Sequence, residues 1–262
     1  MRTYRTLAVL LLAAALFPVV AGATPCPNSA VIHERVFNDC PSSILTTYND
    51  YPTEIWINDA DLDCYGYANL HVWRLSEDGI NDADFDNNSA FRFGMDMVLS
   101  GTGDGEAGLQ ISPWWSQLVD GRFNFRTTDG EIACFGGRLP FYSFTAQQGL
   151  TYVKGSMVHV EMIYRANDLT QENPGTIEYN LTMNGTDYTS GVLPFDEGNP
   201  SEPYGTWGIL DDARVGAHVQ CFLGNGDPVD FRASWTNIEF EVLDEPTATE
   251  TSSWGRVKGL FR

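Results

Sequence analysis

Strict alternation of apolar and polar residues recurs along this chain and limits what it can fold into. In the clearest run every odd-numbered residue from Phe91 to Leu99 is apolar, and similar runs cover 158–164, 177–183 and 215–221. Because successive side chains of a β-strand point to opposite faces, each run places one face in a core and the other in water. No interior segment has helical periodicity.

Turn-forming residues separate these runs. Asn184-Gly185 is a strong hairpin signal, because both residues tolerate the positive φ that a two-residue turn requires. In the last run the apolar parity changes between Trp235 and Ile238, which predicts a β-bulge near 236–237. Many short strands joined by Gly-rich turns predict an all-β, antiparallel sandwich or barrel.

The N-terminus has the pattern of a signal peptide. Arg2 and Arg5 precede an uncharged run from Leu7 to Val20, and small residues follow as far as Ala23. The run of 14 residues is shorter than the roughly 20 that a membrane-spanning helix needs. We therefore expect residues 1–23 to be removed from an exported protein that is not membrane-embedded and lies outside the cell, in the periplasm or on the cell surface.

Residues 245–262 are expected to form a linker and a basic amphipathic tail. The stretch up to Ser253 is rich in Thr, Glu, Ser and Pro, as linkers are. Residues 254–262 then place apolar and basic residues at helical spacing, and they are similar to short Trp-Gly-x-Val/Ile-Lys-x-Leu-Phe/Tyr-Arg tails of other exported bacterial proteins. The tail is either an export or docking tag or a frayed terminus.

The charge of the chain restricts its partners. Asp and Glu number 35 against 15 Lys and Arg, which gives a formal net charge of −20. Such a surface repels the phosphates of nucleic acids, and no basic stripe offsets it, so we expect no nucleic-acid partner. The partners that this charge permits are neutral ligands, cations or basic proteins.

Cysteine usage agrees with export. The chain has five cysteines, all beyond the signal peptide, and oxidising compartments favour disulfides. An odd number leaves at least one thiol free or paired between chains. Cys26 with Cys40 closes the shortest loop and Cys134 with Cys221 would join distant strands, but the sequence does not select a pairing.

The order of segments resembles a known superfamily. A segment at 68–76 leads into the strand at Phe91, the Asn184-Gly185 hairpin follows, and Trp235-Thr236-Asn237-Ile238 lies in the closing strand. This order is similar to the concanavalin A-like lectin/glucanase domains, which include the laminin-G-like domains. The resemblance implies a jelly-roll β-sandwich over residues 51–244, with 24–50 as an N-terminal extension. Its members bind sugars, cut polysaccharides or hold other proteins, so the fold does not choose among these functions.

Evidence for catalysis is weak. Glucanases of this superfamily carry an E-x-D-x-x-E strand, in which two carboxylates share one face, and this chain lacks it. Glu106 and Glu131 are the best candidates for a catalytic pair, but each lies in or beside a Gly-containing turn. We therefore favour a non-catalytic protein, with a polysaccharide hydrolase or lyase as the alternative.

An acidic pattern occurs twice, at 57–63 and 80–86. Alternating aspartates present oxygen ligands on one side of a loop, which suits calcium. Neither copy has the Gly and Glu of an EF-hand, and a solubilising acidic turn is the alternative explanation. The candidate calcium ligands are Asp82, Asp84, Asp86 and Asn88, with Asp59, Asp61 and Asp63 as a weaker set.

Aromatic residues in loops are the other candidates for binding, because sugars stack on exposed rings. Trp56, Trp73 and Trp235 fit strand interiors and are expected in the core. The favoured function is an exported carbohydrate-binding module, and a structural cell-surface protein that docks another protein is a further alternative. The expected stacking residues are Trp114, Trp115, Tyr142 and Trp207.

Overall fold

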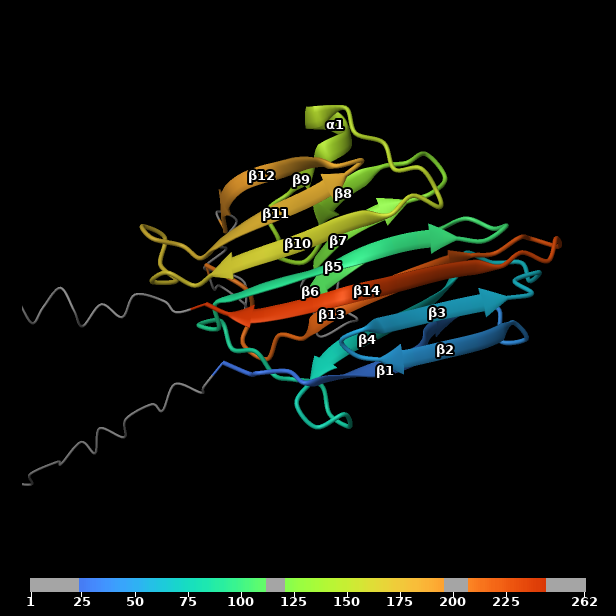
Figure 1. Cartoon of the computed structure of the whole chain (residues 1–262), viewed down its shortest axis with the longest axis horizontal. Helices are drawn as coiled ribbons and strands as arrows, with labels where there is room; N and C mark the ends of the chain where they lie inside the picture. Colours follow the sequence, from blue (N-terminus) through green and yellow to red (C-terminus); the bar gives the residue numbers. More distant parts are fainter. Residues whose placement is uncertain (1–23, 112–120, 196–206, 244–262) are drawn as a thin grey trace, which may run out of the picture.

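The computed structural model describes residues 24–111, 121–195 and 207–243. These residues form two seven-stranded antiparallel sheets that pack face to face (Figure 1). The chain is therefore an antiparallel jelly-roll β-sandwich, as the strand pattern and the resemblance predict. The described residues contain one helix, α1 (Phe144–Gln148), and it is too short to cross a membrane.

Sheet A has the strand order β1-β4-β13-β6-β7-β8-β9. The bounds of its strands, in that order, are Ser29–Asn38, Ala68–Ser76, Val215–Phe222, Gly105–Ile111, Gly121–Arg126, Ile132–Phe135 and Tyr142–Ser143.

Sheet B lies in front of sheet A in Figure 1 and has the order β12-β11-β10-β5-β14-β3-β2. The bounds of its strands, in that order, are Thr186–Pro194, Thr176–Met183, Val158–Arg165, Phe91–Ser100, Phe231–Val242, Glu54–Ala60 and Ile44–Asp50.

Two local predictions are confirmed. The Asn184-Gly185 turn joins β11 to β12, and both residues have positive φ. The register of β14 against β5 shifts between Thr236 and Glu239, around Asn237 with its positive φ, which is the expected bulge.

The core lies between the sheets and is rich in aromatic rings. Trp73 of sheet A and Trp235 of sheet B are fully buried, and their ring centroids lie 5.9 Å apart. The expectation for Trp56 is wrong: its ring packs on the outer face of sheet B, with the Arg232 guanidinium 4.3 Å from its centroid. The parity of β3 explains this, because Ile55 and Ile57 take the inward positions.

The sandwich begins before residue 51. Strands β1 and β2 fall within 24–50, where β1 forms one edge of sheet A and β2 one edge of sheet B. The expected N-terminal extension is therefore part of the domain. Edge strands are half-exposed and lack the clear alternation of central strands, which explains why the pattern did not reveal them.

One disulfide joins Cys40 to Cys64, and Cys26, Cys134 and Cys221 are free thiols. Neither pairing considered from the sequence occurs. Cys134 on β8 and Cys221 on β13 are separated by β6 and β7, so their strands lie about 14 Å apart, well beyond the reach of a disulfide.

Candidate functional site

Polar side chains gather on the outer face of sheet A, which points away from sheet B. On β13, Val215, Ala217 and Val219 enter the core, so His218 and Gln220 face outward. Cross-strand pairing sets the neighbouring outward residues of β6 and β7 beside them. We call this group the polar cluster: Glu106, Gln110, Arg122, Asn124, His218 and Gln220.

Hydrogen bonds connect the polar cluster. Asn124 Nδ2 donates to Glu106 Oε2 (3.1 Å), so Asn124 Oδ1 is left to accept from His218 Nε2 (3.0 Å). This chain of contacts assigns the ring proton of His218 to Nε2 and leaves Nδ1 with a lone pair. Arg122 Nη1 lies 3.3 Å from both Glu106 Oε1 and Gln220 Oε1, and it ties the two strands that flank β6 together.

The missing side chain of Gly108 makes this network possible. Gly108 on β6 lies between His218 on β13 and Asn124 on β7, and the His218–Asn124 bond passes over it. A Cβ at Gly108 would lie 1.8 Å from the carbonyl oxygen of Phe123. Gly216 is restricted in the same way, since a Cβ there would lie 2.0 Å from the carbonyl oxygen of Trp73. Glycine is therefore required at both positions.

The electrostatics of the polar cluster keep His218 neutral. Burial, and after it the positive charge of Arg122, hold the pKa of His218 well below its usual value, against a weaker opposing effect of the Gly108 backbone. His218 is fully buried, whereas the side chain of Arg122 keeps part of its surface exposed.

An aromatic platform continues the same face. Phe222 is the next outward residue after Gln220 on β13, and the Tyr67 ring lies 5.5 Å from the Phe222 ring, tilted by 37°. Tyr67 is 63% exposed and Tyr65 is 81% exposed. We call Tyr65, Tyr67 and Phe222 the aromatic platform. Exposed rings of this kind offer apolar faces on which a sugar can stack.

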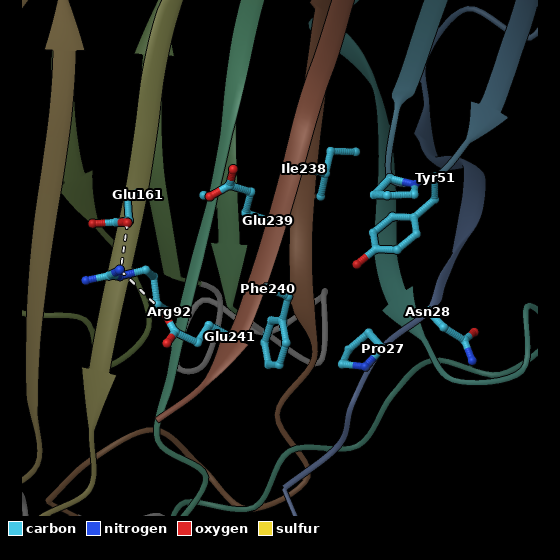
Figure 2. Close-up of a pocket in the computed structure, with 11 residues that line it drawn as sticks. Pro27, Asn28, Tyr51, Arg92, Glu161, Ile238, Glu239, Phe240 and Glu241 are labelled. Atoms are coloured by element: carbon cyan, nitrogen blue, oxygen red, sulfur yellow. Dashed lines mark hydrogen bonds and ion pairs between the residues drawn. The ribbon is translucent and has the colours of Figure 1, made fainter. Parts of the chain in front are cut away.

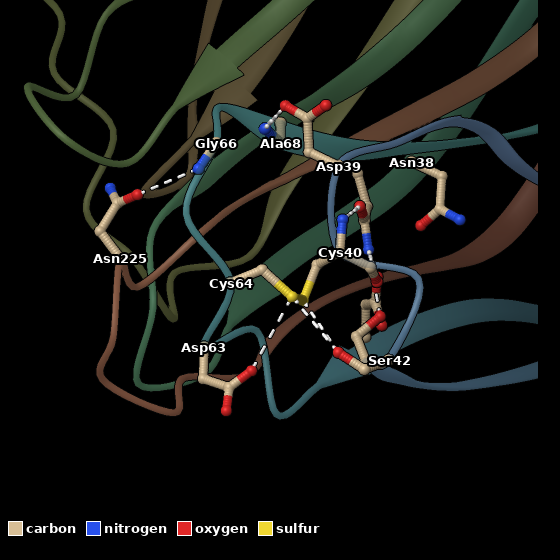
Figure 3. The surroundings of a disulfide bond; sticks show 12 residues. Asn38, Asp39, Cys40, Ser42, Asp63, Cys64, Gly66, Ala68 and Asn225 are labelled. Atoms are coloured by element: carbon tan, nitrogen blue, oxygen red, sulfur yellow. Dashed lines mark hydrogen bonds between the residues drawn. A yellow bond between two sulfur atoms is a disulfide. The ribbon is translucent and has the colours of Figure 1, made fainter.

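The disulfide fixes the loop that carries the platform (Figure 3). Cys64 precedes Tyr65 and is bonded to Cys40 at the end of β1. On the other side of the loop the Gly66 amide donates to Asn225 Oδ1 (3.2 Å), and the Tyr67 amide donates to Asp39 Oδ2 (2.8 Å). The two tyrosines are therefore held by covalent and polar contacts on both flanks.

A buried polar network lies beneath this loop. Asp59 Oδ2 accepts from Asn69 Nδ2 (2.7 Å) and from His71 Nε2 (3.1 Å), and Asn69 Oδ1 accepts from the Cys40 amide (2.9 Å). The Arg35 amide donates to His71 Nδ1, which assigns the ring proton to Nε2. Burial alone would raise the pKa of Asp59, but hydrogen bonds from His71, Ser43 and Asn69 outweigh it and lower that pKa.

Both catalytic candidates are bonded to neighbouring side chains. Glu106 belongs to the polar cluster and is bonded to Arg122 and Asn124. Glu131 lies beyond the end of β7 and pairs with Arg126 at 2.6 Å. Both carboxylates are thus paired with arginines.

The stacking candidates have different outcomes. Trp114 and Trp115 lie outside the described residues. Tyr142 is not an exposed ring: it is 8% exposed, packs edge-on against Phe144 at 4.9 Å, and accepts a hydrogen bond from Gln148 through its hydroxyl. It faces the core because β9 continues the inward parity of Cys134. Trp207 is half-buried in a bend of the chain, and its backbone carbonyl accepts a hydrogen bond from the Gly175 amide.

The main calcium candidates are not brought together, because each carboxylate has another partner. Asp82 bonds His33 (2.7 Å) and Arg74 (2.8 Å), and these bonds lower its pKa although burial alone would raise it. Asp84 pairs with Arg214. Asp86 caps its own turn through the Asn88 amide, so the acidic-turn explanation fits this segment.

The weaker calcium set is also divided. Asp59 is buried near the end of β3, whereas Asp61 and Asp63 are exposed in the following loop. Asp59, His71 and Cys221 bring one potential ligand atom each within 4.8 Å of one another. Calcium takes oxygen ligands, and here the imidazole nitrogen nearest Asp59 already carries a proton, so this group fits a hydrogen-bonded core pair.

Sequence reasoning missed most of the site. The sequence analysis does not single out Arg122, Asn124, Gln220, Tyr65 or Tyr67. One signal was available: the outward positions of β6, β7 and β13 carry Gln, Asn, Arg and His beside glycines.

Comparisons with known proteins find similarity among solved structures alone. No protein-family model matches the chain, and no curated protein matches it. Among solved structures, a family 7 alginate lyase has a TM-score of 0.44 at 11% identity, covering 76% of this chain and 83% of its own. A PL-14 alginate lyase from Aplysia kurodai has a TM-score of 0.43 at 9% identity, covering 76% and 87%.

A seed lectin from Lotus tetragonolobus has a TM-score of 0.40 at 11% identity, covering 77% of this chain and all of its own. At these values the similarity concerns the arrangement of strands alone.

Proposed function

We propose that this protein is an exported carbohydrate-binding protein, and that its ligand lies along the outer face of sheet A. The observation that carries the proposal is the continuity of β13, where Phe222 of the aromatic platform and Gln220 of the polar cluster are adjacent on one face. Stacking rings beside hydrogen-bonding groups are what a sugar chain requires.

The chemistry of this face favours a hydroxyl-rich ligand. Arg122 and Gln220 supply a donor and an amide next to Phe222, and Glu106 balances the charge of Arg122. Sugar hydroxyls both donate and accept, so they can use all three groups. The Cys40–Cys64 disulfide supports action outside the cytoplasm, in agreement with the expected signal peptide.

Glycan binding by a platform variant tests the proposal. Tyr67→Ala should weaken binding about 10-fold, the equivalent of about 1.4 kcal/mol, when affinity is measured by calorimetry on glycans selected from an array. Tyr48→Ala is the matched control, since Tyr48 is also an exposed, stacked ring but lies on sheet B. Equal binding by wild type and Tyr67→Ala, or an equal loss in both variants, would remove the aromatic platform from the account.

A polysaccharide lyase is the second candidate, and His218 is the observation that favours it. A neutral imidazole with a lone pair on Nδ1 can remove the proton next to a uronate carboxylate, which Arg122 can neutralise. The electrons form a C=C bond as the C–O bond to the leaving sugar breaks, and an acid must protonate that oxygen. Full burial of His218 favours binding over elimination.

Ultraviolet absorbance distinguishes the two candidates. A lyase acting on alginate or polygalacturonate produces unsaturated, absorbing ends, and His218→Gln should abolish this signal. Binding without any rise in absorbance supports the carbohydrate-binding function alone.

A further inference from the structure

A pocket lies on sheet B, the sheet that does not carry the polar cluster (Figure 2). It has a volume of about 600 Å³ and opens between strands β5, β10 and β14 and the segments at 27–28 and 51–52. Tyr51 projects toward β14 from one wall, and Ile238 and Phe240 of β14 line the pocket opposite it. These three residues give the pocket apolar surface beside its charged side chains.

The charged lining of this pocket is mainly acidic. Arg92 is bonded to Glu161 (3.2 Å) and to Glu241 (3.4 Å), which uses its charge within the lining. Glu239 pairs across the sheet with Gly94, which has no side chain, and no ion pair joins Glu239 to another described residue. With three glutamates and one arginine, the pocket attracts a cationic ligand that also has apolar groups.

One edge of β14 is open beside this pocket. Pairing of β14 with β3 ends at Thr236 and Glu54, and the bulge follows. The Ile238 amide still donates to the Pro52 carbonyl (3.0 Å). From Glu239 onward β14 pairs with β5 on one side, and among the described strands none pairs with its other side. An unpaired strand edge accepts an extended peptide through main-chain hydrogen bonds.

We propose that residues 254–262 of this same chain dock in the pocket. This segment combines the required chemistry, because it carries three cations and four large apolar residues within nine positions of an otherwise very acidic protein. The cations are Arg256, Lys258 and Arg262, and the apolar residues are Trp254, Val257, Leu260 and Phe261.

The length of chain permits this docking. Trp254 is eleven residues beyond Leu243, so it can reach up to about 36 Å from the end of the described strand. Glu239 and Glu241 lie on that strand within about 14 Å of its end. A tethered segment has an effective concentration in the millimolar range, so even a weak intrinsic affinity fills the pocket.

Zero-length cross-linking with a carbodiimide tests the proposal on the full mature chain. The protein has only two lysines, Lys154 and Lys258, so the products map cleanly by mass spectrometry. Lys154 lies 3.1 Å from Asp104 and provides the internal control. We expect Lys258 to be joined to Glu239 or Glu241 within one chain, and the yield to fall several-fold at high salt, where surface charges are screened.

A tail variant provides the matched comparison. Arg256→Gln with Arg262→Gln keeps both cross-linking partners and leaves the sandwich unchanged, and the yield at Lys258 should fall several-fold while that at Lys154 stays constant. The proposal is overturned if Lys258 forms no product while Lys154 does, if its products are spread over unrelated carboxylates, or if they appear only between chains. Glycan binding does not enter this test, so its outcome is independent of the proposed function.

Discussion

Replacing Asp59 should strongly destabilise the sandwich, because this residue holds the network beneath the aromatic platform. In Asp59→Ala the buried donor His71 Nε2–H loses its acceptor, and Asn69 Nδ2 loses its shortest hydrogen bond and keeps only those to the Cys40 carbonyl (3.2 Å) and Ser43 Oγ (3.1 Å). An unsatisfied buried donor costs about 1–3 kcal/mol, and each lost hydrogen bond to a charged group such as this carboxylate costs about 1.5–3 kcal/mol. We therefore expect a loss of about 4 kcal/mol from a total stability of about 5–15 kcal/mol.

Thermal and urea unfolding of Asp59→Ala measure this loss. A change of about 4 kcal/mol corresponds to a decrease in Tm of roughly 8–16 °C for a domain of this size. Asp63→Ala is the matched control, because Asp63 belongs to the same acidic segment but is exposed, and its effect should stay within about 0.5 kcal/mol. A loss below about 1 kcal/mol in Asp59→Ala would refute the reasoning.

The pH dependence supplies a second check on Asp59. Its pKa is lower in the folded protein than its ordinary value, so the carboxylate stabilises the fold above the ordinary aspartate range. That contribution is lost as the pH falls toward the lowered pKa. The difference in stability between wild type and Asp59→Ala should therefore be greatest near neutral pH and shrink in acid.

Three further substitutions have defined outcomes. Gly108→Ala places a Cβ against the Phe123 carbonyl and should lower the free energy of unfolding by about 2–3 kcal/mol, measured in urea. Gly149→Ala should cost less, because a Cβ at Gly149 has no atom within 4 Å. Cys64→Ser opens a 24-residue connection and should cost about 3 kcal/mol, measured against wild type without reductant. Arg122→Ala should reduce glycan affinity as well as Tm. A decrease in Tm with unchanged affinity would assign Arg122 a purely structural role.

The sequence predicts the sheets far better than the site. The alternation from Phe91 to Leu99 and the Asn184-Gly185 turn each depend on neighbouring residues, so a local pattern contains the information. The polar cluster depends on register, since Glu106, Arg122 and Gln220 are brought together only by the pairing of three strands, of which β13 is distant in the chain from β6 and β7.

The acidic repeat shows why local patterns also mislead. The two copies are nearly identical in sequence, yet Asp59 is buried near the end of a strand, whereas the corresponding Asp82 lies in a loop and bonds His33 and Arg74. The partners of each carboxylate come from other strands, and those partners decide whether it binds a cation, pairs with an arginine or caps a turn.

The most direct test of the account is the affinity of wild type, Tyr67→Ala and Tyr48→Ala for one array-selected glycan, measured under identical conditions. The account predicts that Tyr67→Ala binds about 10-fold more weakly while Tyr48→Ala binds like wild type. Binding that is unchanged in Tyr67→Ala, or lost in Tyr48→Ala, would contradict the assignment of the ligand to the outer face of sheet A.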